Sequence, residues 1–538
     1  MGKKSFKKIM ATMATVILLA SGCGNQQATD TSVLKVAIEK TFTTLSSHQT
    51  TTLAEMEVIA QFMEGLFGYN REGELVPLGA ESYTQSADGL TYTFQLRQDV
   101  LWQNGEPVTA KDYVYSWQQL IKDGAFKHNA KMLKNGAAIL AGTKQPSELG
   151  VQAQSDYTLV ATLEQPDNSF VQYLSSSGFL PLHQASYEAF GGKEGYGTNA
   201  TTLMTNGPFA LSEYVVGSKI VLTKNPQYWD AAHVLLNKVE MTVVPELTTQ
   251  KTLFDSGDID YVRVQGELVD VYADKEKQLA RPENRIMYMY LSGNTANTEV
   301  ALANKNFRKA IALAIDREII TSSIMKDGAQ PLYSLYPRGF MNVDGQDYRD
   351  IANVNNTNPF NPQQAQEYLN KAKQELQQET ITFKFSVQDM VIYKKVFDNI
   401  KSQIEKNLSG VKMEIETLPN QIYFPEIMKF QTPAAMATWG GGTIDYYNFA
   451  QLFEKDSSYN YGKYNNPRFD EKVKQARHEI DPYKQAQYFA DAENILIEDA
   501  EFIPLYQMGQ TYQLSPAIQT VILQPAMPAI QYKYVEKA

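Results

Sequence analysis

The sequence predicts an α/β protein, because short alternating strands and amphipathic helices follow one another along most of its 538 residues. Leu90–Leu96 alternates apolar and polar residues strictly, which is typical of a half-buried strand. Phe307–Ile320 instead carries apolar residues at helical spacing, and so does Leu53–Phe67. Further strands are predicted at Leu34–Ile38, Ile381–Val387 and Met413–Leu418, with a further helix at Val396–Leu408.

The composition excludes several classes of protein. A hydrophobic content of 43% with 20% charged residues is incompatible with a disordered chain, and the length suits roughly two to four domains. Lys plus Arg number 49 against 60 Asp plus Glu, so the net charge of −11 lacks the basic footprint of a nucleic-acid binder. Cys23 is the only cysteine, which excludes an internal disulfide and a cysteine-based metal site.

Signatures of catalysis are missing from the sequence. The five histidines are scattered, with no His-Glu-x-x-His zinc pattern, and there is no Gly-x-Ser-x-Gly nucleophile elbow. We therefore expect a protein that is not an enzyme and that needs neither a cofactor nor a metal. An extracellular hydrolase is the enzyme class that this expectation argues against.

The N-terminus is predicted to be a secretory signal. Lysines at positions 3–8 precede the apolar run Ile9–Ala20, which is too short to span a bilayer core that needs about 20 residues. The sequence Ala20-Ser21-Gly22-Cys23 then resembles a bacterial lipobox, in which the cysteine receives a diacylglyceryl group and becomes the mature N-terminus. We expect residues 1–22 to be removed and residues 23–33 to form a flexible tether. The alternative is an ordinary signal peptide that happens to contain a cysteine.

Motifs along the mature chain resemble one family, the large peptide-binding lipoproteins of ABC importers, solute-binding family 5. Together they cover nearly the whole mature chain in the order that the family has them. The segments that carry the resemblance are Glu64–Phe67, Trp102–Asp112, Thr205–Phe209, Asn225–Asp230, Gly257–Asp260, Phe307–Ala310, Ala314–Arg317, Asp445–Tyr446 and Tyr464–Asp470.

The resemblance implies a two-lobed, periplasmic-binding-protein-like α/β fold of cluster C type, with three domains and a ligand cleft between the lobes. The core of lobe one would comprise residues 34–62, 185–290 and 505–538. An inserted second domain would comprise residues 63–184, and lobe two would comprise residues 291–504. The lobes would close around the ligand by a hinge motion.

The function that the resemblance implies is a lipid-anchored extracellular receptor. It would bind peptides in extended form, through main-chain hydrogen bonds, and deliver them to the permease subunits of an ABC transporter. We expect a monomer on the outer face of the cell membrane, or on its periplasmic side where an outer membrane exists. Two alternatives stay open: a dedicated receptor for a signalling (pheromone) peptide, and a binding protein for a non-peptide solute.

Asp445 is the sharpest candidate for a ligand-binding residue. In the family, an acidic residue after a tryptophan and before a tyrosine pairs with the free α-amino group of the ligand, as a charge-assisted hydrogen bond. Here Trp439 lies further upstream of the acid than the family pattern has it, and the proline that often follows the motif is missing. A second interpretation is that Asp445 caps a helix that begins at Tyr446.

The other predicted ligand residues surround this motif. Gly440, Gly441 and Gly442 would let the backbone approach a ligand closely, or would form a plain turn. Trp439 would form the floor of a side-chain pocket, or pack in the core. The remaining candidates are Tyr446 and Thr51. The run Gln431–Thr438 has no basic residue, so we expect no charge from this segment to hold the ligand's carboxyl end.

Overall fold

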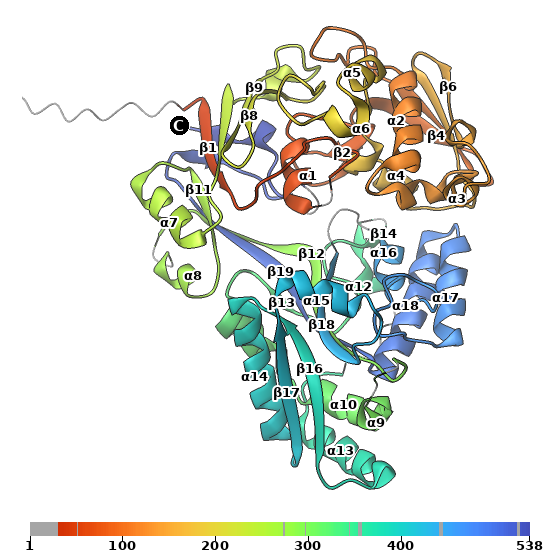
Figure 1. The fold of residues 1–538 in the computed structure, drawn as a ribbon, viewed down its shortest axis with the longest axis vertical. Helices are drawn as coiled ribbons and strands as arrows, with labels where there is room; N and C mark the ends of the chain where they lie inside the picture. The colour runs from red at the N-terminus through yellow and green to blue at the C-terminus, as the bar shows by residue number, and fades with distance from the viewer. Residues whose placement is uncertain are drawn as a thin grey trace, which may run out of the picture.

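The computed structural model describes residues 31–50, 52–272, 275–295, 297, 299–343, 345–352, 354, 358–440, 445–524 and 528–538. The chain forms two lobes, one above the other in Figure 1, joined at one side by long strands. We call lobe one the described residues that precede β12 (Gln278–Leu291) together with those that follow β19 (Phe502–Leu514). Lobe two is the part of the chain between these two strands.

Lobe one contains two mixed or antiparallel sheets. In the first, with the order β1-β10-β9-β8, the strand β1 runs parallel to β10 and the other pairs are antiparallel. Its strands are β1 (Val33–Ile38), β8 (Phe209–Val215), β9 (Lys219–Lys224) and β10 (Lys238–Val243). The second sheet, in the order β4-β5-β7-β6, consists of β4 (Ala80–Gln85), β5 (Thr91–Leu96), β6 (Val151–Ser155) and β7 (Thr158–Thr162).

Short hairpins and helices complete lobe one. The hairpins pair β2 (Phe67–Tyr69) with β3 (Leu75–Pro77), and β20 (Ile518–Thr520) with β21 (Glu536–Lys537). The helices are α1 (Leu53–Ile59), α2 (Ala110–Asp123), α3 (Gly136–Leu140), α4 (Phe170–Tyr173), α5 (Gln184–Ala189), α6 (Gly192–Gly195), α7 (Leu247–Ser256) and α8 (Glu267–Val271). At α2, Thr109 and Asp112 satisfy each other's backbone groups as a capping box, as their spacing predicts.

The predicted helix Leu53–Phe67 is wrong in its second half, because α1 ends at Ile59 and Phe67 begins β2. The chain after α1 is held by another segment. Asn206 exchanges two hydrogen bonds with the backbone of Glu64, and the Gly207 amide donates to the Phe62 carbonyl. Periodicity alone does not reveal that these tertiary hydrogen bonds replace helical ones, because the apolar spacing continues past the true end of the helix.

A large sheet extends from the strands that join the lobes into lobe two, in the order β11-β19-β12-β18-β16-β17, with β13 added beside β19. Its other strands are β11 (Tyr261–Val264), β13 (Gln330–Pro331), β16 (Ile381–Gln388), β17 (Val411–Leu418) and β18 (Ala434–Gly440). A small hairpin pairs β14 (Asn342–Val343) with β15 (Gln346–Asp347). The helices of lobe two are α9 (Val300–Ala303), α10 (Lys305–Leu313), α11 (Arg317–Ile319), α12 (Tyr348–Ile351), α13 (Pro362–Leu376), α14 (Val391–Asn407), α15 (Asn420–Ile427), α16 (Tyr446–Ala450), α17 (Pro467–His478) and α18 (Pro482–Asp499).

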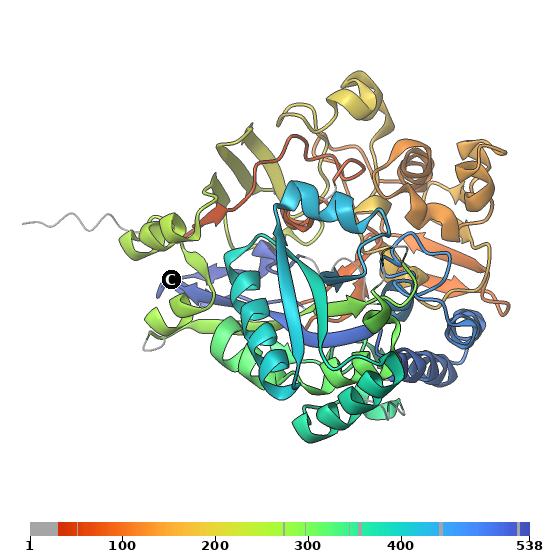
Figure 2. The same ribbon diagram turned by 60° about the horizontal axis from the view of Figure 1, so that its bottom comes forward.

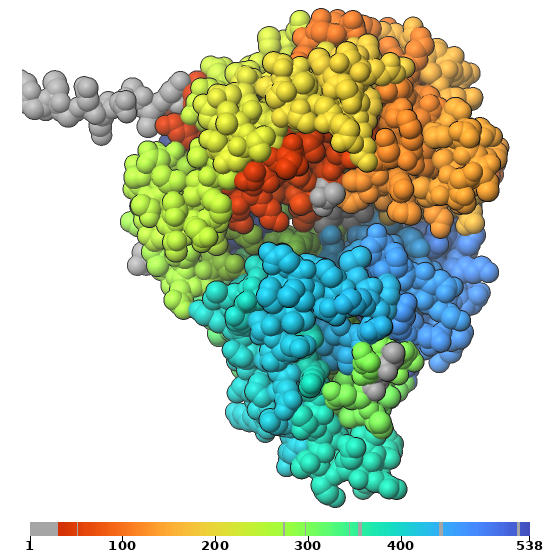
Figure 3. Space-filling model, viewed as in Figure 1, coloured from red at the N-terminus to blue at the C-terminus, as the bar shows by residue number. Residues whose placement is uncertain are grey.

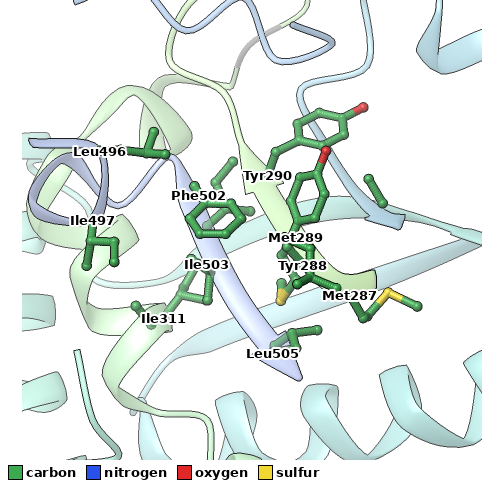
Figure 4. Close-up of a cluster of buried hydrophobic side chains, with 14 of the residues drawn as sticks. Met287, Tyr288, Met289, Tyr290, Ile311, Leu496, Ile497, Phe502, Ile503 and Leu505 are labelled. Carbon is green, nitrogen blue, oxygen red and sulfur yellow. The ribbon is translucent and has the colours of Figure 1, made fainter. Parts of the chain in front are cut away.

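The core of lobe two lies between this sheet and the helices that cover it. Figure 2 shows these helices beside the cyan strands β16 and β17. Buried side chains of β12 and β19 meet those of α10 and α18 in Figure 4, among them Met289, Ile503, Ile311 and Leu496. The long connecting strands are therefore anchored in the core of lobe two. A separate buried cluster fills lobe one.

β12 and β19 pair on both sides of an irregularity. Pro282 pairs with Gly509 and Ile286 pairs with Gln507, so Glu283, Asn284 and Arg285 lie opposite Met508 alone. Such a bulge bends a strand and interrupts its ladder. Within the described residues, no helix is both long enough and apolar enough to cross a lipid bilayer.

Candidate ligand-binding cleft

A cavity of about 1210 Å³ lies between the lobes and is lined by residues of both. Lobe one contributes Leu53 and Met56 of α1, the stretch Glu164–Asp167 and the segment from Tyr173 to Gly178. Lobe two contributes Trp439, Gly440 and residues of α16 and α17. Figure 3 shows the crevice between the lobes on the face viewed in Figure 1. The volume exceeds the roughly 300–1,000 Å³ of ordinary small-molecule sites.

Asp445 lies at the start of α16, where the lobes meet, and only 7% of its surface is exposed. It caps this helix, because its carboxylate accepts hydrogen bonds from the backbone amides of Tyr447 at 3.1 Å and Asn448 at 3.2 Å. The same carboxylate accepts a bond of 3.2 Å from the hydroxyl of Tyr173, which belongs to lobe one. The capping interpretation is thus confirmed, and the cap faces the opposite lobe.

The surroundings of Asp445 favour a cation. Burial raises the pKa of its carboxyl group to about 7, and the negative charge of Asp167 in lobe one adds to the rise. The two amides and the Tyr173 hydroxyl oppose this effect. Among the described residues, no Lys or Arg side chain forms an ion pair with Asp445. A positively charged group between Asp445 and Asp167 would therefore interact favourably with both.

Trp439 and Gly440 both line the cavity at the end of β18. The Trp439 indole is half-buried, donates to the Asn448 carbonyl at 2.7 Å and packs against Tyr459 with ring centroids 4.8 Å apart. Gly440 has a φ of +125°, and an added Cβ would lie 2.0 Å from the Asn284 carbonyl oxygen. Glycine is needed here because β12 passes so closely.

Tyr446 does not line the cavity, and its ring packs inside lobe two. Its ring stacks on Phe489, with centroids 5.2 Å apart, and also contacts Tyr336 and Tyr348 inside lobe two. Four other predicted residues, Cys23, Thr51, Gly441 and Gly442, lie outside the described residues. The neighbour of Thr51, Thr52, forms a capping box with Glu55 at the start of α1.

Apart from Thr51, sequence reasoning named no residue of lobe one at this site. Tyr173 and Asp167 approach Asp445, and the Asn168 side chain donates to the carbonyls of Glu479 at 3.3 Å and Ile480 at 3.1 Å across the cleft. The only local signal is the polar turn after Pro166, in which Asp167 accepts the Ser169 amide at 2.9 Å. A turn of this kind is common on any surface.

The two-lobed fold and the cleft between the lobes place this chain in the class of two-lobed binding proteins. The profile of the family "Bacterial extracellular solute-binding proteins, family 5 Middle" matches residues 74–461. The chain therefore belongs to family 5 of the bacterial extracellular solute-binding proteins, which bind ligands and are not enzymes.

Relatives and solved structures agree with this family. The dipeptide-binding protein DppE of Bacillus subtilis is 27% identical over 481 residues, which cover 88% of this chain and 86% of that protein. The substrate-binding domain of an oligopeptide ABC transporter from Bacillus anthracis is 31% identical, with a TM-score of 0.78 over 95% of this chain and 99% of that one. The pheromone receptor PrgZ, solved for its mode of peptide binding, is 26% identical, with a TM-score of 0.77 over 94% and 99%.

Proposed function

We propose that this protein binds peptides in extended form between its lobes and delivers them to an ABC transporter for import. The observation that carries the proposal is Asp445, a buried carboxylate that faces lobe one beside a cavity of about 1210 Å³. Such a group suits the α-ammonium of a peptide, because a charge-assisted hydrogen bond offsets the cost of burying the carboxylate. The named functions of DppE and of the Bacillus anthracis protein support the same ligand class.

The remaining features of the proposal concern the ligand contacts and the location of the protein. Trp439 and the backbone of Gly440–Gly442 would contact the peptide, with Thr51 and Tyr446 as further candidates. Cys23 would carry the lipid that anchors a monomeric receptor to the outer face of the cell membrane. Closure would rotate lobe two, for which the sequence predicts the bounds 291–504, against lobe one and its inserted domain, predicted at residues 63–184.

A second candidate is a receptor dedicated to one signalling peptide, which the similarity to PrgZ favours. Both candidates are tested by releasing the ligands that co-purify with the protein and recording their mass spectra. A mixture of short peptides is expected for nutrient import, and a single sequence for signalling. Recovery of a non-peptide solute, with no binding of added peptides, would contradict both.

A further inference from the structure

A turn of lobe one, Pro166–Ser169, contacts lobe two on the side of the molecule away from the connecting strands. α4, which follows this turn, and α17 of lobe two lie on the same side in Figure 1, opposite β11. The Asn168 side chain donates from Nδ2 to the carbonyls of Glu479 at 3.3 Å and Ile480 at 3.1 Å. Because both partners are acceptors, only the amide nitrogen can face them.

These two carbonyls lie at the C-terminal end of α17. Glu479 is the C-cap residue of this helix, and the last carbonyls of a helix have no partner inside the helix. From lobe two itself, the Gln485 side chain donates to the Glu479 carbonyl at a longer distance of 3.5 Å. Asn168 of lobe one therefore caps a helix that belongs to lobe two. This contact involves no ligand atom and is lost when the lobes separate.

The turn is held firmly in its own lobe. The carboxylate of Asp167 accepts both the amide and the hydroxyl of Ser169, and the hydroxyl of Tyr92 donates to the Asp167 carbonyl at 3.3 Å. Tyr92 belongs to β5 and is part of the buried cluster of lobe one. The same segment ends at Tyr173, whose hydroxyl bonds Asp445. When lobe one rotates, the whole segment moves with it toward or away from lobe two.

Closure also brings two carboxylates near each other. Asp167 is half-buried and lines the cavity, and Asp445 lies buried at the start of α16. Burial raises the pKa of the Asp445 carboxyl group to about 7, and the negative charge of Asp167 contributes to the rise. In the part of the chain that the structure describes, neither carboxylate forms an ion pair with a Lys or Arg side chain. Two like charges therefore oppose the closed arrangement that brings them together.

The cationic side chains of the cavity wall are exposed or engaged with other groups. Arg477 stacks over the Tyr447 ring at 4.0 Å, and both Arg477 and Lys131 interact with the charge of Glu454. Exposed charges are weakened by solvent and salt. The Lys and Arg residues that line the cavity are Lys131, Lys455, Lys474 and Arg477, all of them exposed. A cationic group of a ligand is thus the natural partner for the two carboxylates.

We propose that the turn Pro166–Ser169 is a clasp that makes closure of the lobes depend on the charge of the ligand. Asn168 holds lobe two in the closed form, whatever the ligand is. Asp167 opposes closure through its repulsion of Asp445 unless a cationic group lies between the two carboxylates. This inference rests on the proposed peptide-binding function, which supplies the cationic group as the α-ammonium of the peptide.

Distance measurements on the ligand-free protein test the clasp without any peptide. Spin labels are attached to cysteines at exposed positions of α2 and α13, in the full chain with Cys23→Ala so that no other thiol reacts. Slightly above neutral pH, where Asp445 is mostly ionised, Asp167→Asn should raise the ratio of closed to open molecules about fivefold, or about 1 kcal/mol. Asn168→Ala should lower this ratio by a similar factor, because a hydrogen-bonded contact of about that strength is lost.

Two matched controls separate these effects from general changes in turns and in charge. Asn104→Ala alters another turn of lobe one, in which the Asn104 side chain accepts the Glu106 amide at 3.0 Å. Glu81→Gln removes one negative charge of lobe one at an exposed position of β4. Both should leave the distances as they are in the parent. Asp167→Asn itself keeps a side-chain oxygen that can accept the Ser169 amide, so the turn should be preserved.

Titration calorimetry with tetra-alanine, as the free amine and as the N-acetylated form, then tests the dependence on ligand charge. Asn168→Ala should weaken the binding of both peptides about fivefold and leave the ratio of their affinities unchanged. Asp167→Asn should instead reduce the preference for the free amine about fivefold, mainly because the acetylated peptide binds better than it does to the parent. Asn104→Ala and Glu81→Gln should reproduce the affinities of the parent.

Three results would overturn the clasp. One is an Asp167→Asn variant with the parent's ligand-free distances and the parent's preference for the free amine. The second is an Asn168→Ala variant that binds both peptides as tightly as the parent does, and the third is a change in the controls as large as in the variants. Failure of every peptide to bind the parent would instead contradict the proposed function, and the ligand-free distances would still decide whether Asp167 and Asn168 control closure.

Discussion

The hydroxyl of Tyr173 donates a hydrogen bond of 3.2 Å to the carboxylate of Asp445, and this bond joins the two lobes. Asp445 thereby contacts lobe one while its other hydrogen bonds cap α16 in lobe two. Its ionisation state affects the cap, the contact between the lobes and the proposed ligand contact together.

Asp445→Asn should weaken the binding of peptides that have a free amino terminus. Loss of one partner of a buried charged pair costs about 2–5 kcal/mol, or about 30-fold to several thousand-fold in affinity. N-acetylation of the peptide should weaken binding to the parent similarly, yet matter much less in the variant. Calorimetry with one peptide in both forms measures this, and Tyr173→Phe serves as the control that removes the interlobe bond but leaves the charge. Equal binding of acetylated and free peptide by the parent would remove Asp445 from this role.

Peptide affinity should fall below neutral pH. The carboxyl group of Asp445 has its pKa raised to about 7, and a peptide ammonium requires the deprotonated form. The α-amino group stays protonated up to about pH 8, so affinity should decline toward about tenfold per unit as pH drops below 7. Calorimetry between mildly acidic and neutral pH measures the slope, which should flatten in Asp445→Asn. A slope identical in parent and variant would assign the effect to another group.

The stability of the ligand-free protein should show the opposite trend. The folded-state pKa of Asp445, about 7, lies above its ordinary value of 3.8, so the folded state holds this proton more tightly than the unfolded state. The contribution of this group to stability is therefore present below pH 4 and is lost as the pH rises toward 7. The difference between the thermal unfolding curves of the parent and Asp445→Asn isolates this contribution across the pH range.

Gly440→Ala should destabilise lobe two by about 2 kcal/mol or more, because the new Cβ meets both an unfavourable φ of +125° and the Asn284 carbonyl at 2.0 Å. Gly339→Ala is the matched control, since Gly339 has a φ of +88° with no heavy atom within 4 Å of an added Cβ. Urea unfolding should therefore give a smaller loss for Gly339→Ala. Equal losses would mean that the close approach of β12 does not matter.

Cys23→Ala should release the protein from membranes or leave the precursor uncut, because Cys23 is the only thiol that can carry a lipid. Membrane fractionation and the size of the processed chain are the measurements. A variant that is processed and fractionates as the parent does would contradict lipid anchoring through Cys23. Ser21→Ala is the control, because it changes a residue two positions before Cys23 and keeps the thiol. It should be processed and anchored as the parent is.

Local patterns predicted much of the fold, and tertiary contacts account for the rest. The strands at Leu34–Ile38 and Ile381–Val387 and the cap at Thr109 follow from spacing and local hydrogen bonding. The early end of α1 does not, because it depends on Asn206, about 140 positions further along the chain. The motif singled out Asp445, which the structure places at the start of α16 against lobe one, and its contact with a ligand stays a prediction. Asp167 and Tyr173 could not be predicted, because only the folded chain brings them to the cleft.

The bulge at Glu283–Arg285 gives the molecule the geometry of a lever. A second irregularity follows at once, because Met287 pairs with Tyr506 and Tyr288 pairs with Pro504. The ladder of β12 and β19 is thus interrupted twice between Pro282 and Tyr288, and beyond this stretch both strands are embedded in the core of lobe two. Any bending would therefore be concentrated in this short stretch. Displacement in a rotating body grows with distance from its pivot. For a rotation about this stretch, α17, which lies away from β12 at the edge of lobe two in Figure 1, would travel further than β18, which pairs directly with β12. A pair of distance probes on α17 and α3 would amplify even a slight change of angle into a readable signal.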